Sequence, residues 1–122
     1  MTDRRKKLGD FGELAALDYL SRQGLREVAR KWRCPRGEID LVMRDDEVLV
    51  FIEVRTRRGE GALESIGPRK QARLAALAYR YLSAHTLPDE TPWRIDVVAI
   101  TIGADRRIGT IEWVRSAVGE SV

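Results

Sequence analysis

Two long segments of the chain carry apolar residues at the spacing of a helix. The first covers residues 8–23, and Gly24 directly after it suits the left-handed conformation that ends many helices. The second covers residues 68–84, with Pro68 in its first turn and Ser65 or Gly67 as the preceding cap. The expected apolar faces consist of Leu14, Ala15, Leu17, Tyr19 and Leu20 in the first and of Leu74, Leu77, Ala78, Tyr81 and Leu82 in the second.

Segments rich in β-branched and aromatic residues fill most of the remaining chain. Strands are predicted over residues 25–33, 38–44, 47–56, 93–102 and 109–115. The second and third form a hairpin that turns at Asp45 and Asp46, and residues 57–64 are expected to form a loop. Helices interleaved with strands in this order are typical of an α/β domain with a mixed sheet flanked by helices. The apolar run at residues 48–54 predicts a central strand covered on both faces.

The composition is that of an ordinary globular domain. Of the 122 residues, 43% are apolar and 34% are charged, so one domain with one core is expected. No apolar run approaches the roughly 20 residues needed to span a bilayer, and no signal-peptide pattern is present. The single cysteine, Cys34, excludes an internal disulfide and a zinc site of the CxxC type. A cytoplasmic protein without membrane contact is expected.

Basic residues are concentrated in two segments. Residues 1–36 contain ten Lys or Arg against five Asp or Glu, and residues 55–73 contain six against two. A basic surface beside a few acids is expected where a polyanion meets a metal site. Solvated surface charge is the alternative for any single arginine.

The predicted hairpin carries charged residues where a buried strand pair should be apolar. A turn at residues 45–46 sets Asp40 opposite Phe51, and facing residues point to the same side of a sheet. Asp40 and Glu53 then become diagonal neighbours that can share a divalent ion. Four charged side chains are expected on one face, at the end away from the turn: Glu38, Asp40, Glu53 and Arg55.

A carboxylate next to so apolar a segment needs a compensating charge. Left unpaired, Glu53 would cost several kcal/mol or bind a proton. Compensation can come from Arg55 or from a bound Mg²⁺ or Mn²⁺, ions that prefer carboxylate oxygens and water. Because one arginine can neutralise one acid but not three, the residues favour a metal site. A salt-bridged strand end and an exposed acidic cluster remain as alternatives.

Both predicted helices can bring further groups to this place. Glu13 lies on a largely apolar helix face, and Gly12 beside it permits a close backbone approach. Lys70 and Gln71 extend the core-facing stripe of the second helix at its N-terminal end. The structural alternatives are a first-turn acid that favours the helix N-terminus for Glu13 and a solvated basic turn for Lys70.

Four stretches follow one another along most of the chain: GDFGELAALDYL (9–20), RGEIDLV (36–42), VFIEVRTR (50–57) and RIDVVAI (94–100). This ordered set resembles the restriction-endonuclease-like superfamily, whose motif is (P)D…(D/E)xK. It resembles more closely the YraN-like family of small bacterial proteins, which are similar to Holliday-junction resolvases. The resemblance implies a three-layer α/β core in which the mixed sheet lies between helices.

The resemblance also implies roles for individual residues. Asp40, Glu53 and Glu13 would hold the metal, Glu38 would be an accessory acid, and Arg55 occupies the lysine position of the ExK element. Arginine stays protonated in proteins, so this side chain could orient water or stabilise charge on a phosphate but could not act as a base. Lys70 is the candidate for a movable ammonium instead.

The expected function is that of a Mg²⁺- or Mn²⁺-dependent DNA nuclease acting on branched or damaged DNA. Resolvase-like action would need two active sites and hence a homodimer. Contacts with the DNA backbone are expected from Arg57, Arg58, Arg69, Lys70, Gln71 and Arg73. Two alternatives stay open: a catalytically silent nucleic-acid-binding module of the same fold, and a protein-interaction domain in which the acids form a structural ion-pair network.

Overall fold

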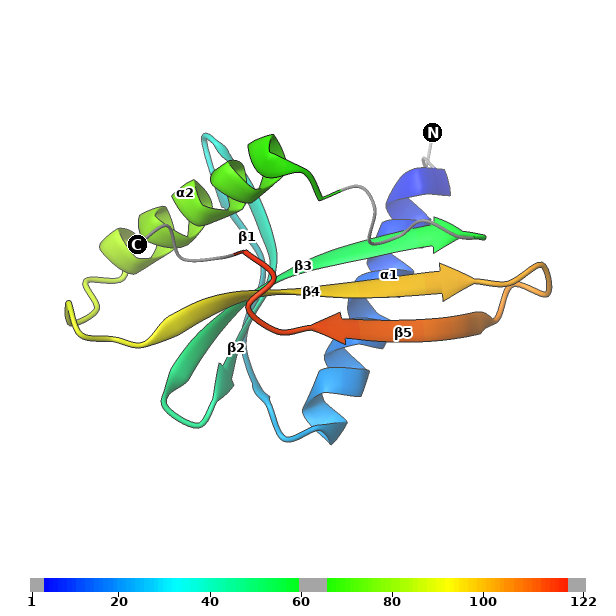
Figure 1. Cartoon of the computed structure of the whole chain (residues 1–122), viewed down its shortest axis with the longest axis horizontal. Helices are drawn as coiled ribbons and strands as arrows, with labels where there is room; N and C mark the ends of the chain where they lie inside the picture. Colours follow the sequence, from blue (N-terminus) through cyan, green and yellow to red (C-terminus); the bar gives the residue numbers. More distant parts are fainter. Residues whose placement is uncertain (1–3, 60–65, 119–122) are drawn as a thin grey trace.

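A computed structural model describes residues 4–59 and 66–118 and is shown in Figure 1. The helices and strands, in chain order, are α1 (Arg4–Arg22), β1 (Arg26–Cys34), β2 (Gly37–Asp45), β3 (Val48–Arg58), α2 (Pro68–Ala84), β4 (Trp93–Ile102) and β5 (Ile108–Val114). The strands form one sheet in the order β1-β2-β3-β4-β5. All neighbours are antiparallel except β3 and β4, which are parallel and joined through α2. The predicted α/β class with a mixed sheet is confirmed.

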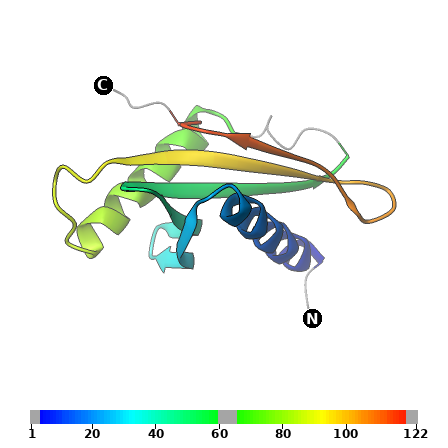
Figure 2. The ribbon, with the colours of Figure 1, turned by 90° about the horizontal axis from the view of Figure 1, so that it is seen from below.

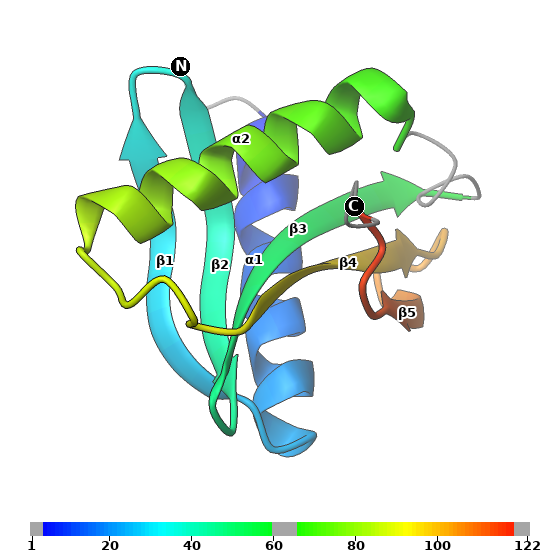
Figure 3. The ribbon, with the colours of Figure 1, turned by 60° about the vertical axis from the view of Figure 1, so that its left-hand side comes forward.

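Each helix covers one face of the sheet, and the alternation of β3 divides its side chains between them. Val50 and Ile52 pack in a cluster with Leu20 of α1, whereas Leu49 and Phe51 pack with α2. Figures 2 and 3 show the two helices on opposite sides of the strands. The expected central strand, covered on both faces, is therefore β3, and the three layers place α1 and α2 on either side of it.

Most predicted boundaries agree with the structure. The second helix and the strand at residues 93–102 have the expected bounds, and Gly24 has the left-handed φ of 100° expected after α1. The first helix begins at Arg4 instead of residue 8, because lysine and arginine are good helix formers. β3 continues into the expected loop as far as Arg58, and most of the remaining loop, with Ser65, lies outside the described residues. Neither described helix is long and apolar enough to cross a membrane.

One member of the predicted apolar face of α1 is wrong. Leu14 is 55% exposed, and the helix buries Gly12, Ala16 and Leu20 instead. Gly12 is required at its position, since a Cβ there would lie 1.8 Å from Thr56 Oγ1 on β3. This close approach holds the next residue, Glu13, against the sheet.

The register of the hairpin differs from the prediction by two residues. The turn residues are Asp46 and Glu47, and Asp46 takes the left-handed φ of 54° that aspartate tolerates. As a result Val42, not Asp40, lies opposite Phe51. Continued along the strands, this register would set Asp40 directly opposite Glu53 instead of diagonal to it.

The strands of the hairpin separate at their charged ends, and we call this opening the fork. Paired residues of β2 and β3 end at Leu41 and Ile52. Beyond them β2 continues beside β1 as far as Gly37, while β3 continues beside β4 as far as Arg58. Figure 3 shows the two strands diverging in this direction. The fork therefore begins at Asp40 and Glu53, the two acids that the sequence singles out.

A separate buried acid, Asp96, connects β4 with the end of β5. It is 0% exposed and accepts hydrogen bonds from Arg94 Nε at 3.0 Å, Trp113 Nε1 at 2.9 Å and the Ser116 backbone N–H at 2.9 Å. Arg94 also contacts Asp45 Oδ2 at 3.0 Å. Because four donor–acceptor contacts hold this network together, its role is structural.

Candidate metal centre

At the start of the fork, the side chain of Asp40 takes the place of a backbone hydrogen-bond acceptor. Its Oδ2 accepts a hydrogen bond of 2.8 Å from the backbone N–H of Val54, which the diverging strand leaves without a ladder partner on that side. Burial raises the pKa of the Asp40 carboxyl to about 8, and the negative charge of Glu53 and then of Glu13 acts in the same direction. At neutral pH and without a metal, the Asp40 carboxyl is therefore mostly protonated.

The direction of the Asp40 side chain follows from a break in the inward–outward alternation of β2. Ile39 packs in the cluster on the α2 face, whereas Leu41 packs in the cluster on the α1 face, so β2 changes face at Asp40. In β1 the position across from it, between the pairs of Arg30 and Trp32, is Lys31, which has a φ of 49°. A lysine in the left-handed region is strained, and such strain is concentrated at functional sites.

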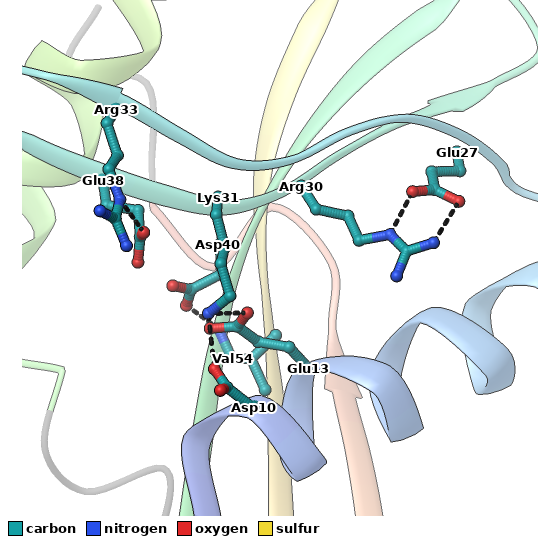
Figure 4. Close-up of polar contacts among 9 residues, drawn as sticks. All are labelled: Asp10, Glu13, Glu27, Arg30, Lys31, Arg33, Glu38, Asp40 and Val54. Carbon is teal, nitrogen blue, oxygen red and sulfur yellow. Dashed lines mark hydrogen bonds and ion pairs between the residues drawn. The ribbon is translucent and has the colours of Figure 1, made fainter. Parts of the chain in front are cut away.

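Three carboxylates meet on the α1 side of the fork: Glu13, Glu38 and Asp40, which we call the fork acids. Each offers one oxygen, and these oxygens all lie within 4.8 Å of one another. Figure 4 shows Glu13 reaching from α1 toward Asp40 on the sheet, beside Lys31. These three residues could hold a metal ion. They differ from the predicted ligand set of Asp40, Glu53 and Glu13 by one member, because Glu38 is drawn in and Glu53 is not.

A lysine lies where the acids need positive charge. Lys31 Nζ is 2.8 Å from Glu13 Oε1 and 2.7 Å from Asp10 Oδ1 (Figure 4). The hydrogen bond to Asp10 and then that to Glu13 raise the pKa of the Lys31 ammonium, which is therefore a fixed cation and not a base. Glu38 is paired with Arg33 at 2.9 Å. Within residues 4–59 and 66–118, no cation lies within ion-pair distance of Asp40.

Glu53 lies beside the fork acids but is held from the other helix. Its Oε2 is 3.0 Å from Lys70 Nζ and 3.6 Å from Arg55 Nη1, and only 7% of its side chain is exposed. The expectation that Lys70 points at the acids is thus confirmed. Its partner is Glu53, whose charge in turn raises the pKa of Asp40.

A cavity of about 470 Å³ opens in front of the acids. Its lining combines Glu13 and Asp40 with the basic residues Arg5, Arg55 and Arg57. A hollow lined by both carboxylates and guanidinium groups suits a phosphate group bridged to a cation. Arg55 thus lies in the same cavity as Glu13 and Asp40.

The other predicted DNA contacts are less uniform. Arg57, Arg58, Arg69 and Arg73 are exposed, as a binding surface requires. Gln71 donates its side-chain amide to the carbonyl of Ile66 at 3.3 Å, so it holds the segment before α2.

Sequence reasoning did not identify Lys31 or Asp10. Asp10 and Glu13 are three residues apart on one helix and can therefore bind one cation together. That spacing was the available signal, but the lysine comes from an edge strand whose irregular backbone no local pattern predicts.

Comparison with known proteins agrees with this arrangement of elements. A family model described as "Uncharacterised protein family UPF0102" matches residues 12–100. The chain belongs to the UPF0102 family. UPF0102 proteins of Roseiflexus castenholzii and Chloroflexus aurantiacus are 55% and 53% identical to it, and each alignment covers at least 98% of both chains. A UPF0102 protein of Ectopseudomonas mendocina is 45% identical over 90% of this chain and 92% of its own length.

The UPF0102 match contains all the acids of the fork. Glu13, Glu38, Asp40 and Glu53 lie inside residues 12–100, as do Arg55 and Lys70. The family is the YraN-like one that the sequence resembles, and its link with the restriction-endonuclease-like fold is consistent with the layered architecture described above. In this UPF0102 chain Arg4–Phe11 and the residues after Ile100 lie outside the matched range.

Proposed function

We propose that the chain is a metal-dependent nuclease that hydrolyses phosphodiester bonds in DNA. The observation that supports this most strongly is the meeting of Glu13, Glu38 and Asp40 at the fork, where Glu13 and Asp40 line a cavity together with arginines. The three acids are half-buried, and Asp40 has no cation within ion-pair distance in the described part of the chain. A dication would add the positive charge that the cluster needs, and the arginines that line the cavity would bind a phosphate beside it.

The donor set suits Mg²⁺ or Mn²⁺. All three candidate ligands are carboxylates, and neither histidine nor cysteine belongs to the group, which favours hard cations over zinc. Such an ion, when bound, lowers the pKa of a coordinated water and offsets negative charge on the phosphate. Burial is the main cause of the raised pKa of Asp40, and the charge of Glu53 adds to it; a dication bound nearby would favour the ionised carboxylate and so lower this pKa.

The remaining polar groups of the site would position the substrate. Arg55 and Arg57 border the cavity and would donate hydrogen bonds to phosphate oxygens, which makes binding salt-dependent and largely independent of sequence. Lys70 holds the carboxylate of Glu53 and keeps that charge from adding fully to the fork acids. Since Arg55 cannot accept a proton, the proton of the attacking water would leave to a carboxylate or to solvent. A homodimer would bring two such sites to a branched DNA.

A catalytically silent DNA-binding module is the second candidate, and Lys31 favours it. Its ammonium already neutralises Glu13 and Asp10, with N–O distances of 2.8 and 2.7 Å. A tethered lysine in that position competes with a dication for the same oxygens. In this second function the basic surface binds DNA and the acids form an ion-pair network.

Cleavage of a panel of labelled DNAs distinguishes the two. The panel contains a single strand, a blunt duplex, a flap and a four-way junction, incubated with Mg²⁺, Mn²⁺ or EDTA. Wild-type protein should cleave at least one of them with Mg²⁺ or Mn²⁺ and none with EDTA. Asp40→Asn should lose cleavage and retain DNA binding, and Glu47→Gln, a charge-neutralising change in the exposed turn of the same hairpin, should retain both.

The outcomes are exclusive. Binding without cleavage by the wild-type protein at any metal concentration establishes the silent module. Equal cleavage by Asp40→Asn and wild type rejects the fork acids as the catalytic centre. Absence of DNA binding by the wild-type protein would leave the ion-pair network as a structural feature of a protein-interaction domain.

A further inference from the structure

A second hollow, the basic groove, lies beside the candidate metal centre. It has a volume of about 690 Å³, and five of its eight lining residues are basic while none is acidic. The basic residues are Arg4, Arg5, Lys7, Arg58 and Arg106. Figures 1 and 2 show that the first turns of α1 lie on the same side of the molecule as the ends of β3 and β4 and the turn before β5.

The groove adjoins the cavity in front of the fork acids. Arg5 and Leu8 line both, and the cavity then leads to Glu13 and Asp40. A polyanion bound in the groove would therefore extend directly to the fork acids. The basic lining, without an acid, favours a polyanion such as a chain of phosphates as the occupant.

An exposed aromatic ring lies among these positive charges. Phe11 is 45% exposed on α1, and no ring contact to it is recorded among the described residues. Leu8 and the buried Ile102 supply further apolar lining. Alternating cations and an open aromatic face are the combination with which proteins bind single-stranded nucleic acid, since bases stack on the ring while the backbone follows the charges.

The first turn of α1, the helix that carries this ring, has a charge that is unfavourable at a helix N-terminus. Arg4–Lys7 are four consecutive basic residues at the positive end of the α1 dipole, and the first turn contains no acid. Local rules of this kind are broken mainly at functional sites. A bound phosphate would reverse the effect, because it interacts favourably with both the dipole and the side chains.

We propose that the basic groove binds an unpaired strand of DNA, with one base stacked on Phe11 and the backbone held by Arg58, Arg106 and the first turn of α1. A base inside a duplex is already stacked and cannot reach the ring, so the preferred substrate class is DNA with a single-stranded segment, such as a flap or a gapped arm. The placement of the scissile phosphate at the fork acids rests on the proposed nuclease function. Binding of the strand itself does not.

Fluorescence anisotropy in EDTA tests the binding alone. Full-length protein is titrated into labelled oligo-dT and, separately, into a blunt duplex of the same length. Phe11→Ala should weaken oligo-dT binding about 10-fold, within the range measured for loss of one stacked base, and should leave duplex binding unchanged. The matched control is Leu14→Ala, which removes a side chain that is 55% exposed on the same helix but does not line the groove. This control should bind like the wild type.

Salt dependence tests the charged part of the groove. The double variant Arg58→Gln/Arg106→Gln should reduce the slope of log K against log salt on oligo-dT by about 1.4, the value expected for two phosphate contacts with a single strand. Arg22→Gln, at the other end of α1 and outside the groove, should leave the slope unchanged. Circular dichroism confirms that each variant is folded.

Three results would overturn the proposal. These are equal oligo-dT affinities for Phe11→Ala and Leu14→Ala, an unchanged salt slope for the double arginine variant, and binding of anionic phospholipid vesicles without binding of oligo-dT. Failure of the nuclease function is separate, since oligo-dT binding that depends on Phe11 in a protein that cleaves nothing supports the groove and rejects catalysis. If cleavage is lost in Asp40→Asn but unaffected by Phe11→Ala on every substrate, the result supports the nuclease function and rejects the role of the groove.

Discussion

Asp40→Asn should change the pH dependence of folding stability in a defined direction. In the folded protein burial and the charge of Glu53 raise the pKa of the Asp40 carboxyl to about 8, compared with 3.8 for an ordinary aspartate. Between these values the native state binds one more proton at this residue than the unfolded state. Without metal, the proton on Asp40 therefore stabilises the folded state at low pH. This stabilisation decreases as the pH rises from 3.8 and is lost above about 8.

The magnitude follows from the two pKa values. At ~1.4 kcal/mol per pKa unit, the separation between 3.8 and about 8 corresponds to about 6 kcal/mol. Asparagine keeps the side-chain oxygen that accepts the Val54 N–H but carries no charge at any pH. The variant should therefore match the wild type only below about pH 4, exceed it by about 2 kcal/mol at pH 5, and exceed it by up to about 6 kcal/mol at pH 9.

Urea unfolding in EDTA at whole pH values from 5 to 9 measures this difference. Glu47→Gln, in the exposed turn, serves as the control and should follow the wild-type pH profile. A constant difference between wild type and Asp40→Asn across this range would refute the buried, charge-crowded description of the fork. So would a wild-type protein that is more stable than the variant at pH 9.

Three further changes test other parts of the structure. Gly12→Ala should destabilise the protein by about 1–3 kcal/mol, because the new Cβ would lie 1.8 Å from Thr56 Oγ1. Gly9→Ala, whose new Cβ meets nothing within 4 Å, should stabilise the protein by about 0.5–1 kcal/mol. Thermal and urea unfolding measure the stability of both variants, and equal effects would reject the close approach of α1 to β3. Lys31→Met should tighten Mn²⁺ binding in calorimetry, because the competing ammonium 2.8 Å from Glu13 Oε1 is removed, and an unchanged affinity would contradict this competition. Asp96→Asn should cost about 3–5 kcal/mol in urea unfolding, because it breaks the ion pair between the fully buried Asp96 and the largely buried Arg94. A loss below about 1 kcal/mol would show that the network is dispensable.

The hairpin shows why sequence predicts elements better than register. Either Asp45 or Asp46 could occupy the left-handed turn position, and both alternatives leave the apolar alternation of the strands intact. Only the structure assigns the φ of 54° to Asp46. The resulting slip of two residues keeps Phe51 in the core but changes which residue faces Asp40.

The two helices differ in how well their contributions were predicted. The rotation of α2 is set by its apolar stripe, and Lys70 continues that stripe toward the acids, so its ion pair with Glu53 could be expected. The α1 side depends on Lys31, whose backbone lies in the left-handed region within a strand. Tertiary contacts impose that conformation, and the sequence of β1 alone gives no indication of it.

Lys31 also changes how the arginine in the lysine position of the motif, Arg55, is interpreted. The sequence presents an arginine in the lysine position of the nuclease motif, and the structure adds a lysine from β1 that contacts Glu13. Because its ammonium is stabilised by two carboxylates, it acts by charge and not by proton transfer. The neighbouring acids Glu13 and Glu53 thus each have a cation as partner, while Asp40 has none within ion-pair distance in the described part of the chain.

Calorimetric titration of the full-length protein with Mn²⁺ at pH 7 tests most directly whether the fork acids hold a dication. Repeating it in two buffers with different ionisation enthalpies gives the number of protons released. The expected result is one ion bound per chain with release of about one proton, because Asp40, with a pKa of about 8, must give up its proton to become a ligand. Asp40→Asn should remove both the binding and the proton release. Wild-type protein that binds no Mn²⁺, or a variant that binds it equally well, would contradict the assignment of Glu13, Glu38 and Asp40 as a metal centre.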